Sequence, residues 1–195
     1  MSSYAVVLAA IALCLTPITG CASDDAAAST KISKIFELED GRLTAPFGDT
    51  VSENIFRYSR VSPNVGLAGK LTPEGVHEAK ALGFNLVVDL RQPDENGVAE
   101  EKAIVAEIGL PYENAPLVKD RSALAQIDYI TGLLEDESNY PVLIHCGTSN
   151  RAGAFWAIYR AGQGVPNIVA IEEGRAGGLT SREAFVREML GMPAE

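Results

Sequence analysis

Short apolar runs alternate with amphipathic segments from residue 54 to residue 190, and this alternation restricts the fold more than any other feature of the chain. Runs rich in β-branched and aromatic residues predict strands, at residues 54–62, 84–91, 110–117 and 141–146. Segments with apolar residues at helical spacing predict helices, at residues 71–83, 95–109, 122–136, 151–162, 168–175 and 181–190. Strands that alternate with helices favour an α/β fold, in which helices flank a central, mainly parallel sheet.

The first residues differ in composition from the rest of the chain. An uninterrupted apolar run at residues 4–15 is too short to cross a bilayer and suits the core of a secretory signal. The following residues, Ile18 to Cys21, resemble the lipobox of bacterial lipoproteins. That resemblance implies cleavage before Cys21, lipid attachment to its sulfur, and export to the periplasmic side of a bacterial membrane. Because residues 1–20 contain no Lys or Arg, a misassigned start before a cytoplasmic protein is the alternative.

The chain has 195 residues, which is enough for one domain with a substantial core. We therefore predict a signal peptide at residues 1–21, a tether and N-terminal extension at 22–50, and one catalytic domain at 51–195. The net charge of −10 argues against nucleic acid as a partner, because phosphate backbones are held by clustered Lys and Arg.

Cysteine usage leaves one thiol for the domain. Cys14 would leave with the signal and Cys21 would carry lipid, so only Cys146 remains and no internal disulfide is expected. Together with His77 and His145, one thiol does not make a zinc site. We expect neither a metal nor another cofactor, and the sequence does not indicate an oligomeric state.

The remaining thiol stands where a ligand site is expected. Cys146 ends the strand predicted at residues 141–146, and ligands bind just beyond the carboxyl ends of parallel strands. A short polar loop and the helix predicted at 151–162 follow, so backbone N–H groups and a helix N-terminus point toward the sulfur. Arg151 can hold two anionic oxygens through its planar guanidinium. Such a positive field favours thiolate and makes Cys146 a nucleophile; the alternative is a buried, inert cysteine.

These residues resemble the phosphatase-like domain of the beta-lactamase-hydrolase-like family, a divergent branch of the cysteine-dependent protein tyrosine and dual-specificity phosphatases. The resemblance covers roughly residues 54–190 and includes "LTPEGVHEAKALGFNLVVDLR", "HC", "AGAFWAIYRA" and "EEGRAGGLTS". It implies a three-layer phosphatase-like fold and the cleavage of a phosphomonoester, on a protein or a small anionic molecule. It also implies that Cys146 is the nucleophile, that Arg151 binds the oxyanion, and that the loop supplies backbone donors from Gly147, Thr148, Ser149 and Asn150.

Two departures from the pattern of this superfamily keep a second activity open. Its phosphatases usually place five residues between Cys and Arg, whereas this chain has four, as many rhodanese sulfurtransferases do. Its phosphatases also place Ser or Thr after the arginine, and this chain has Ala152. The alternative is therefore a sulfurtransferase that forms a persulfide on Cys146. A third hypothesis is a lipoprotein that binds anions without catalysis.

Three further residues are candidates for supporting roles. Asp120 lies 26 residues before Cys146 and is a candidate general acid, although it also suits the cap of the next helix. Arg91 follows a predicted strand and is expected either at the mouth of the site or in a surface ion pair with Asp94 or Glu95. His145 is expected to tune the thiolate and is not placed as a base.

Overall fold

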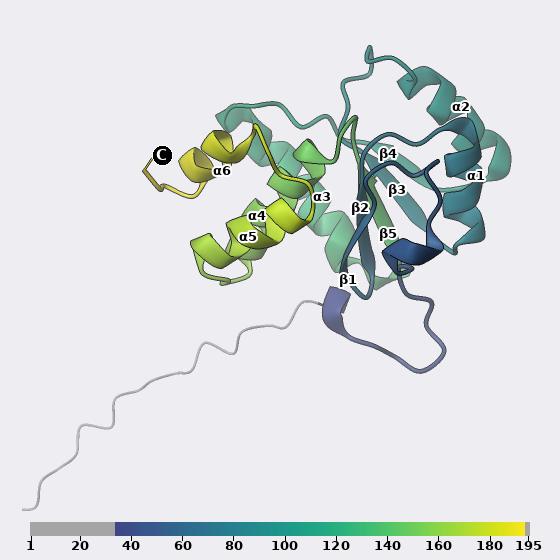
Figure 1. The fold of residues 1–195 in the computed structure, drawn as a ribbon, viewed down its shortest axis with the longest axis horizontal. Helices are drawn as coiled ribbons and strands as arrows, with labels where there is room; N and C mark the ends of the chain where they lie inside the picture. The colour runs from purple at the N-terminus through teal and green to yellow at the C-terminus, as the bar shows by residue number, and fades with distance from the viewer. Residues whose placement is uncertain (1–33, 194–195) are drawn as a thin grey trace, which may run out of the picture.

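A computed structural model describes residues 34–193 of the protein. Within these residues, one five-stranded sheet lies between two layers of helices (Figure 1). The predicted α/β class is confirmed. The predicted signal peptide and the lipidation of Cys21 lie outside the described residues and remain predictions. No helix in the described part of the chain combines the length and the apolar character that crossing a bilayer requires.

The strand order in the sheet is β1-β2-β5-β3-β4. The strands are β1 (Ser59–Ser62), β2 (Val65–Ala68), β3 (Leu86–Asp89), β4 (Tyr112–Asn114) and β5 (Val142–His145). Only β1 and β2 pair in antiparallel fashion, and the other three pairs are parallel. The sequence did not indicate β2, and the strand predicted at residues 54–62 is reduced to its second half.

The helices form the two outer layers. They are α1 (Pro73–Ala81), α2 (Val98–Ile108), α3 (Leu124–Glu135), α4 (Asn150–Gly162), α5 (Asn167–Ala176) and α6 (Glu183–Met189). Figure 1 shows α1 and α2 on one side of the sheet and α3 to α6 on the other. Thr72 is the N-cap of α1, because its hydroxyl accepts a hydrogen bond from the N–H of Gly75 at 3.1 Å. His77 is exposed on α1.

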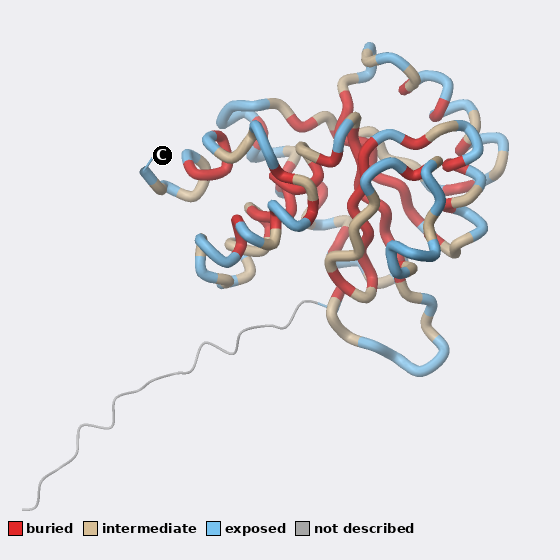
Figure 2. The backbone as a smooth tube through the Cα atoms, in the orientation of Figure 1, coloured by how far each residue is buried: buried red, intermediate tan, exposed pale blue. Residues whose placement is uncertain are grey.

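Burial is concentrated in the three inner strands, β2, β3 and β5, and in α4 (Figure 2). In β5, Val142 and Ile144 belong to the larger apolar cluster, which includes α3, α4 and α5, and Cys146 continues their side of the sheet. Leu143 belongs to the cluster formed with α1 and α2. Because side chains alternate along a strand, His145 follows Leu143 toward the α1–α2 layer, away from Cys146.

The layer that holds Cys146 is closely packed where α4 crosses α5. Gly153 of α4 leaves so little space that an added Cβ atom would lie 2.3 Å from the backbone nitrogen of Leu179. A Cβ atom on Gly174 of α5 would meet the Gly153 carbonyl oxygen at 2.7 Å. The two glycines therefore let the helices approach closely, and this approach holds the N-terminal end of α4 against the segment that follows α5.

Residues before the predicted domain boundary also pack on the core. Ile35, in the short 3-10 helix Lys34–Phe36, is fully buried in the larger apolar cluster. Ala45 is fully buried in the cluster beneath α1. The packed unit therefore includes residues from about Ile35 onward, in addition to the predicted domain at 51–195.

Candidate active site

The loop between Cys146 and Arg151 is held by hydrogen bonds to two neighbouring segments, and some of its backbone N–H groups have no acceptor in the described part of the chain. Its Gly147 carbonyl accepts a hydrogen bond from the N–H of Lys70 at 3.2 Å. Ser149 adopts a left-handed conformation with φ of 67°, and its hydroxyl donates to the Gly177 carbonyl at 2.7 Å. Within the described residues, the N–H groups of Gly147 and Thr148 donate to no acceptor. This arrangement leaves donors available to an anion beside the start of α4.

Cys146 itself is 1% exposed and lies at the end of β5. Arg151 comes from the first turn of α4, and its guanidinium donates to both carboxylate oxygens of Glu95. The hydrogen bond with Glu95 raises the pKa of Arg151, burial opposes this, and the nearby Cys146 sulfur raises the pKa further. The structure therefore brings Cys146 and Arg151 together, as predicted, and adds Glu95 as the partner that holds Arg151.

A backbone hydrogen bond also holds the Glu95 carboxylate in place. Its Oε1 atom accepts a hydrogen bond from the backbone N–H of Gln92 at 2.7 Å. The bond to Arg151 is the main cause of the lowered pKa of Glu95, so the carboxylate is charged at neutral pH. Both contacts use the Nη atoms of Arg151, which also interacts with the Cys146 sulfur.

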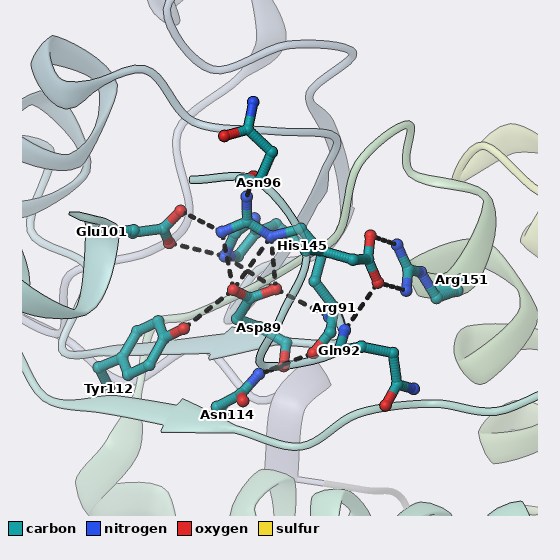
Figure 3. A network of polar contacts seen from close by, with 10 residues as sticks. Asp89, Arg91, Gln92, Asn96, Glu101, Tyr112, Asn114, His145 and Arg151 are labelled. Carbon is teal, nitrogen blue, oxygen red and sulfur yellow. Dashed lines mark hydrogen bonds and ion pairs between the residues drawn. The ribbon is translucent and has the colours of Figure 1, made fainter. Parts of the chain in front are cut away.

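The structure corrects both expectations for Arg91. Arg91 neither faces the mouth of the site nor forms a surface ion pair with Asp94 or Glu95. Its side chain is 5% exposed and donates to Asp89 Oδ2 at 2.7 Å and Glu101 Oε2 at 2.6 Å. Figure 3 shows this cluster next to the Arg151 pair. Arg91 is therefore a buried structural cation that holds the end of β3 to α2.

His145 completes this cluster behind the site. Its side chain is fully buried, and Nε2 lies 2.8 Å from Glu101 Oε1 and 3.8 Å from Asp89 Oδ1. Burial alone would lower the pKa of His145, but Glu101 and then Asp89 raise it overall. For Asp89, burial alone would raise the pKa, but the charge of His145 and the bonds from Arg91 lower it overall. His145 therefore lies beside two carboxylates that favour its protonated form, on the side of the sheet away from the sulfur.

The same cluster has the composition of a metal site. One oxygen each of Asp89 and Glu101 and one nitrogen of His145 lie within 4.8 Å of one another. The Arg91 guanidinium already donates to one oxygen of each carboxylate, so a fixed positive charge lies beside these groups. When His145 carries a proton, two cations stand beside the two carboxylates.

Asp120 caps the short 3-10 helix Arg121–Ala123. Its Oδ1 atom accepts from the Ser122 hydroxyl at 2.6 Å and from the Ser122 N–H at 2.8 Å. These two bonds, the hydroxyl first, lower the pKa of Asp120. The capping interpretation is therefore supported by the structure, and the role of general acid stays a prediction.

The sequence did not single out three residues around the site. Glu95 was considered only as a partner of Arg91, and Arg182 and the side-chain role of Asn150 were not considered. The Asn150 side chain accepts from the N–H of Thr180 at 2.8 Å and donates to the Ser181 hydroxyl at 2.8 Å. These contacts join segments about 30 residues apart, so no local pattern could have indicated them.

Comparisons with known proteins agree with this geometry. Residues 56–163 match the family described as beta-lactamase hydrolase-like protein, phosphatase-like domain. A comparison with curated proteins found no match.

Many solved structures share the fold, and three of them are compared with this chain. The DUF442 protein of Shewanella putrefaciens CN-32 is 18% identical, with a TM-score of 0.57 over 71% of this chain and 94% of its own. P. aeruginosa TpbA in complex with pTyr is 23% identical, with a TM-score of 0.58 over 78% of this chain and 95% of its own. The PP-IP phosphatase SIW14 from S. cerevisiae, in complex with citrate, is 16% identical, with a TM-score of 0.57 over 73% of this chain and 87% of its own.

The matched residues run from the turn before β1 to the end of α4, and they include both Cys146 and Arg151. The matched segment is more than half of the chain. The protein belongs to the phosphatase-like domain family of beta-lactamase hydrolase-like proteins.

Proposed function

We propose that the protein is a cysteine-dependent phosphatase that hydrolyses a phosphomonoester through a phosphocysteine on Cys146. One observation carries the proposal: a strand end, a loop with free N–H groups and the first turn of a helix bring Cys146 and Arg151 together. The fold family supports the reaction class, and the pTyr in the TpbA complex supports an aryl phosphate as the first substrate to test.

The reaction has two displacements at phosphorus. In the first, the Cys146 sulfur attacks, the ester P–O bond breaks, and the leaving oxygen takes a proton from an acid. Arg151 and the N–H groups of Gly147 and Thr148 stabilise the charge that builds on the equatorial oxygens. In the second, water attacks phosphorus, the S–P bond breaks, and inorganic phosphate and thiolate are released.

Asp120 is the proposed acid of the first displacement. It lies in the loop that Arg182 contacts through the Val118 carbonyl at 2.8 Å. An Asp120→Asn variant tests this role with two leaving groups. If Asp120 is the acid, kcat for phenyl phosphate falls far more than kcat for nitrophenyl phosphate, because only the poorer leaving group needs the proton. If Asp120 is only a cap, both rates stay near wild type, because an Asn side chain caps a helix about as well as Asp.

A persulfide-forming sulfurtransferase is the second candidate, favoured by the four-residue loop and by the absence of a hydroxyl at Ala152, which is fully buried. The two activities are separated with the full chain and its Cys146→Ser variant, each assayed with nitrophenyl phosphate and with thiosulfate plus cyanide. We expect phosphate release that the substitution abolishes and no thiocyanate. Thiocyanate formation, with a sulfur adduct on Cys146 by mass spectrometry, would establish the second candidate instead.

A further inference from the structure

The segment from Gly177 to Arg182 lies directly against the loop of the active site. The Ser149 hydroxyl donates to the Gly177 carbonyl at 2.7 Å. Asn150 Oδ1 accepts from the N–H of Thr180 at 2.8 Å and from the N–H of Arg182 at 3.4 Å. Because Asn150 immediately precedes Arg151, these bonds place the backbone of Arg182 at the edge of the site.

The Arg182 side chain has only a neutral partner. Its Nη1 atom donates to the Val118 carbonyl oxygen at 2.8 Å, and Val118 packs against the apolar cluster that contains Cys146. Within the described residues, no carboxylate forms an ion pair with Arg182. The side chain is half-buried and spans from the N-terminus of α6 to the loop that carries Asp120. One of its five donors is therefore used, and its charge is not neutralised.

The Arg182 guanidinium interacts electrostatically with the charged groups around Cys146. Burial lowers the pKa of Arg182, the charge of Arg151 lowers it further, and Cys146 and Glu95 act in the opposite direction. The four side chains thus share one electrostatic environment. Glu95 compensates the charge of Arg151 through two hydrogen bonds. Arg182 is thus a cation beside the site that forms no ion pair with a carboxylate in the described part of the chain.

We infer that Arg182 is a substrate-binding residue that selects the dianionic phosphoryl group over monoanionic esters of the same shape. The inference rests on the proposed phosphatase function and deepens it. Glu95 and Arg151 together carry no net charge, so they hold tetrahedral oxygens without favouring a second negative charge. Arg182 supplies the additional positive charge, and its bond to a neutral carbonyl is readily exchanged for a bond to an anionic oxygen.

Equilibrium binding tests the inference without catalysis. In the full chain with Cys146→Ser, the affinities of phosphotyrosine and sulfotyrosine are measured by calorimetry at pH 8, where the phosphate is a dianion and the sulfate a monoanion. We expect Arg182→Met to weaken phosphotyrosine binding by about tenfold or more, because charged hydrogen bonds have about that effect. Sulfotyrosine binding should change by less than about threefold, since the sulfate lacks the second charge.

Two further variants separate charge from structure. Arg182→Lys keeps the positive charge and should keep most of the preference for phosphotyrosine over sulfotyrosine. If the guanidinium has only a structural role, Arg182→Lys and Arg182→Met should lose binding to the same extent. Lys102→Met removes one exposed positive charge from α2, on the opposite face of the sheet, and should change neither affinity. Thermal unfolding of each variant checks that the fold persists.

The outcomes distinguish this inference from the proposed function. If phosphotyrosine binding depends on Arg151 but Arg182→Met leaves it unchanged, the inference is wrong and the phosphatase proposal stands. If Arg182→Met weakens the binding of phosphotyrosine and sulfotyrosine equally, the inference is also wrong, because Arg182 then does not distinguish a dianion from a monoanion. If Cys146→Ser binds neither ligand, both proposals fail together.

Discussion

Replacing Arg91 with Met should destabilise the protein strongly, and more at neutral than at mildly acidic pH. The substitution keeps an apolar stem of similar length but leaves Asp89 and Glu101 buried with only His145 as a charged partner. Removing one member of a buried ion pair typically costs about 3–5 kcal/mol, because the remaining charge is buried without compensation.

The structure also sets an upper limit to this cost. One of the two carboxylates can take up a proton and become neutral. Its pKa in the unfolded chain is about 4, so holding the proton at pH 7 costs about 1.4 kcal/mol for each of about three pH units, or about 4 kcal/mol. At pH 5, protonating the same carboxylate costs only about 1.4 kcal/mol. The destabilisation should therefore shrink as the pH falls from 7 to 5.

Urea unfolding, followed by circular dichroism at both pH values, measures the two free energies. The control is Arg175→Met, since Arg175 also bonds two carboxylates, Glu172 and Glu183, but is 41% exposed. Because exposed ion pairs contribute little, this variant should unfold close to wild type. A loss of less than about 1 kcal/mol for Arg91→Met at pH 7, or an equal loss at both pH values, would refute the reasoning.

The wild-type cluster makes its own contribution to the pH dependence of stability. The pKa of His145 is raised in the folded protein, so its contribution is complete below about pH 6.5 and is lost as pH rises through the folded value. The pKa of Asp89 is lowered, so its contribution is present above about pH 4 and is lost as pH falls through the folded value. Both contributions are complete between these limits.

Four other outcomes are expected. Glu95→Gln should lower both KM and kcat for an aryl phosphate, because the site gains net positive charge while its arginine loses the partner that orients it; a raised KM would contradict this. Gly153→Ala should lower the free energy of unfolding by about 1–3 kcal/mol through overpacking, whereas Gly132→Ala, which has open space on α3, should not lower it. Mild peroxide should inactivate the enzyme by oxidising Cys146, and inorganic phosphate should slow this; retained activity with an accessible thiol would contradict an activated sulfur. Labelled palmitate should be incorporated in a bacterial host and lost in Cys21→Ala, and labelling that persists would exclude lipidation at that sulfur.

Much of the fold follows from local patterns. Helix α1 begins after Thr72 and α2 ends at Gly109, whose φ of 64° suits a residue without a side chain. The strand β2 was missed because its four residues, Val65–Ala68, include a glycine and show no alternation. All four are buried, since β2 lies inside the sheet between β1 and β5. Its identity as a strand therefore depends on its neighbours.

The site shows the same division between local and distant information. The sequence by itself determined the pairing of Cys146 with Arg151, because a strand end, a loop of four residues and a helix start constrain both to one place. Only the tertiary structure decided what surrounds them. Glu95 and Arg182 reach the site from segments 56 and 31 residues away from Arg151, and Arg91 turns inward to Asp89 and Glu101. The interaction between two charged side chains depends on the distance between them in space. The order of residues along the chain does not show which distant segments come close together.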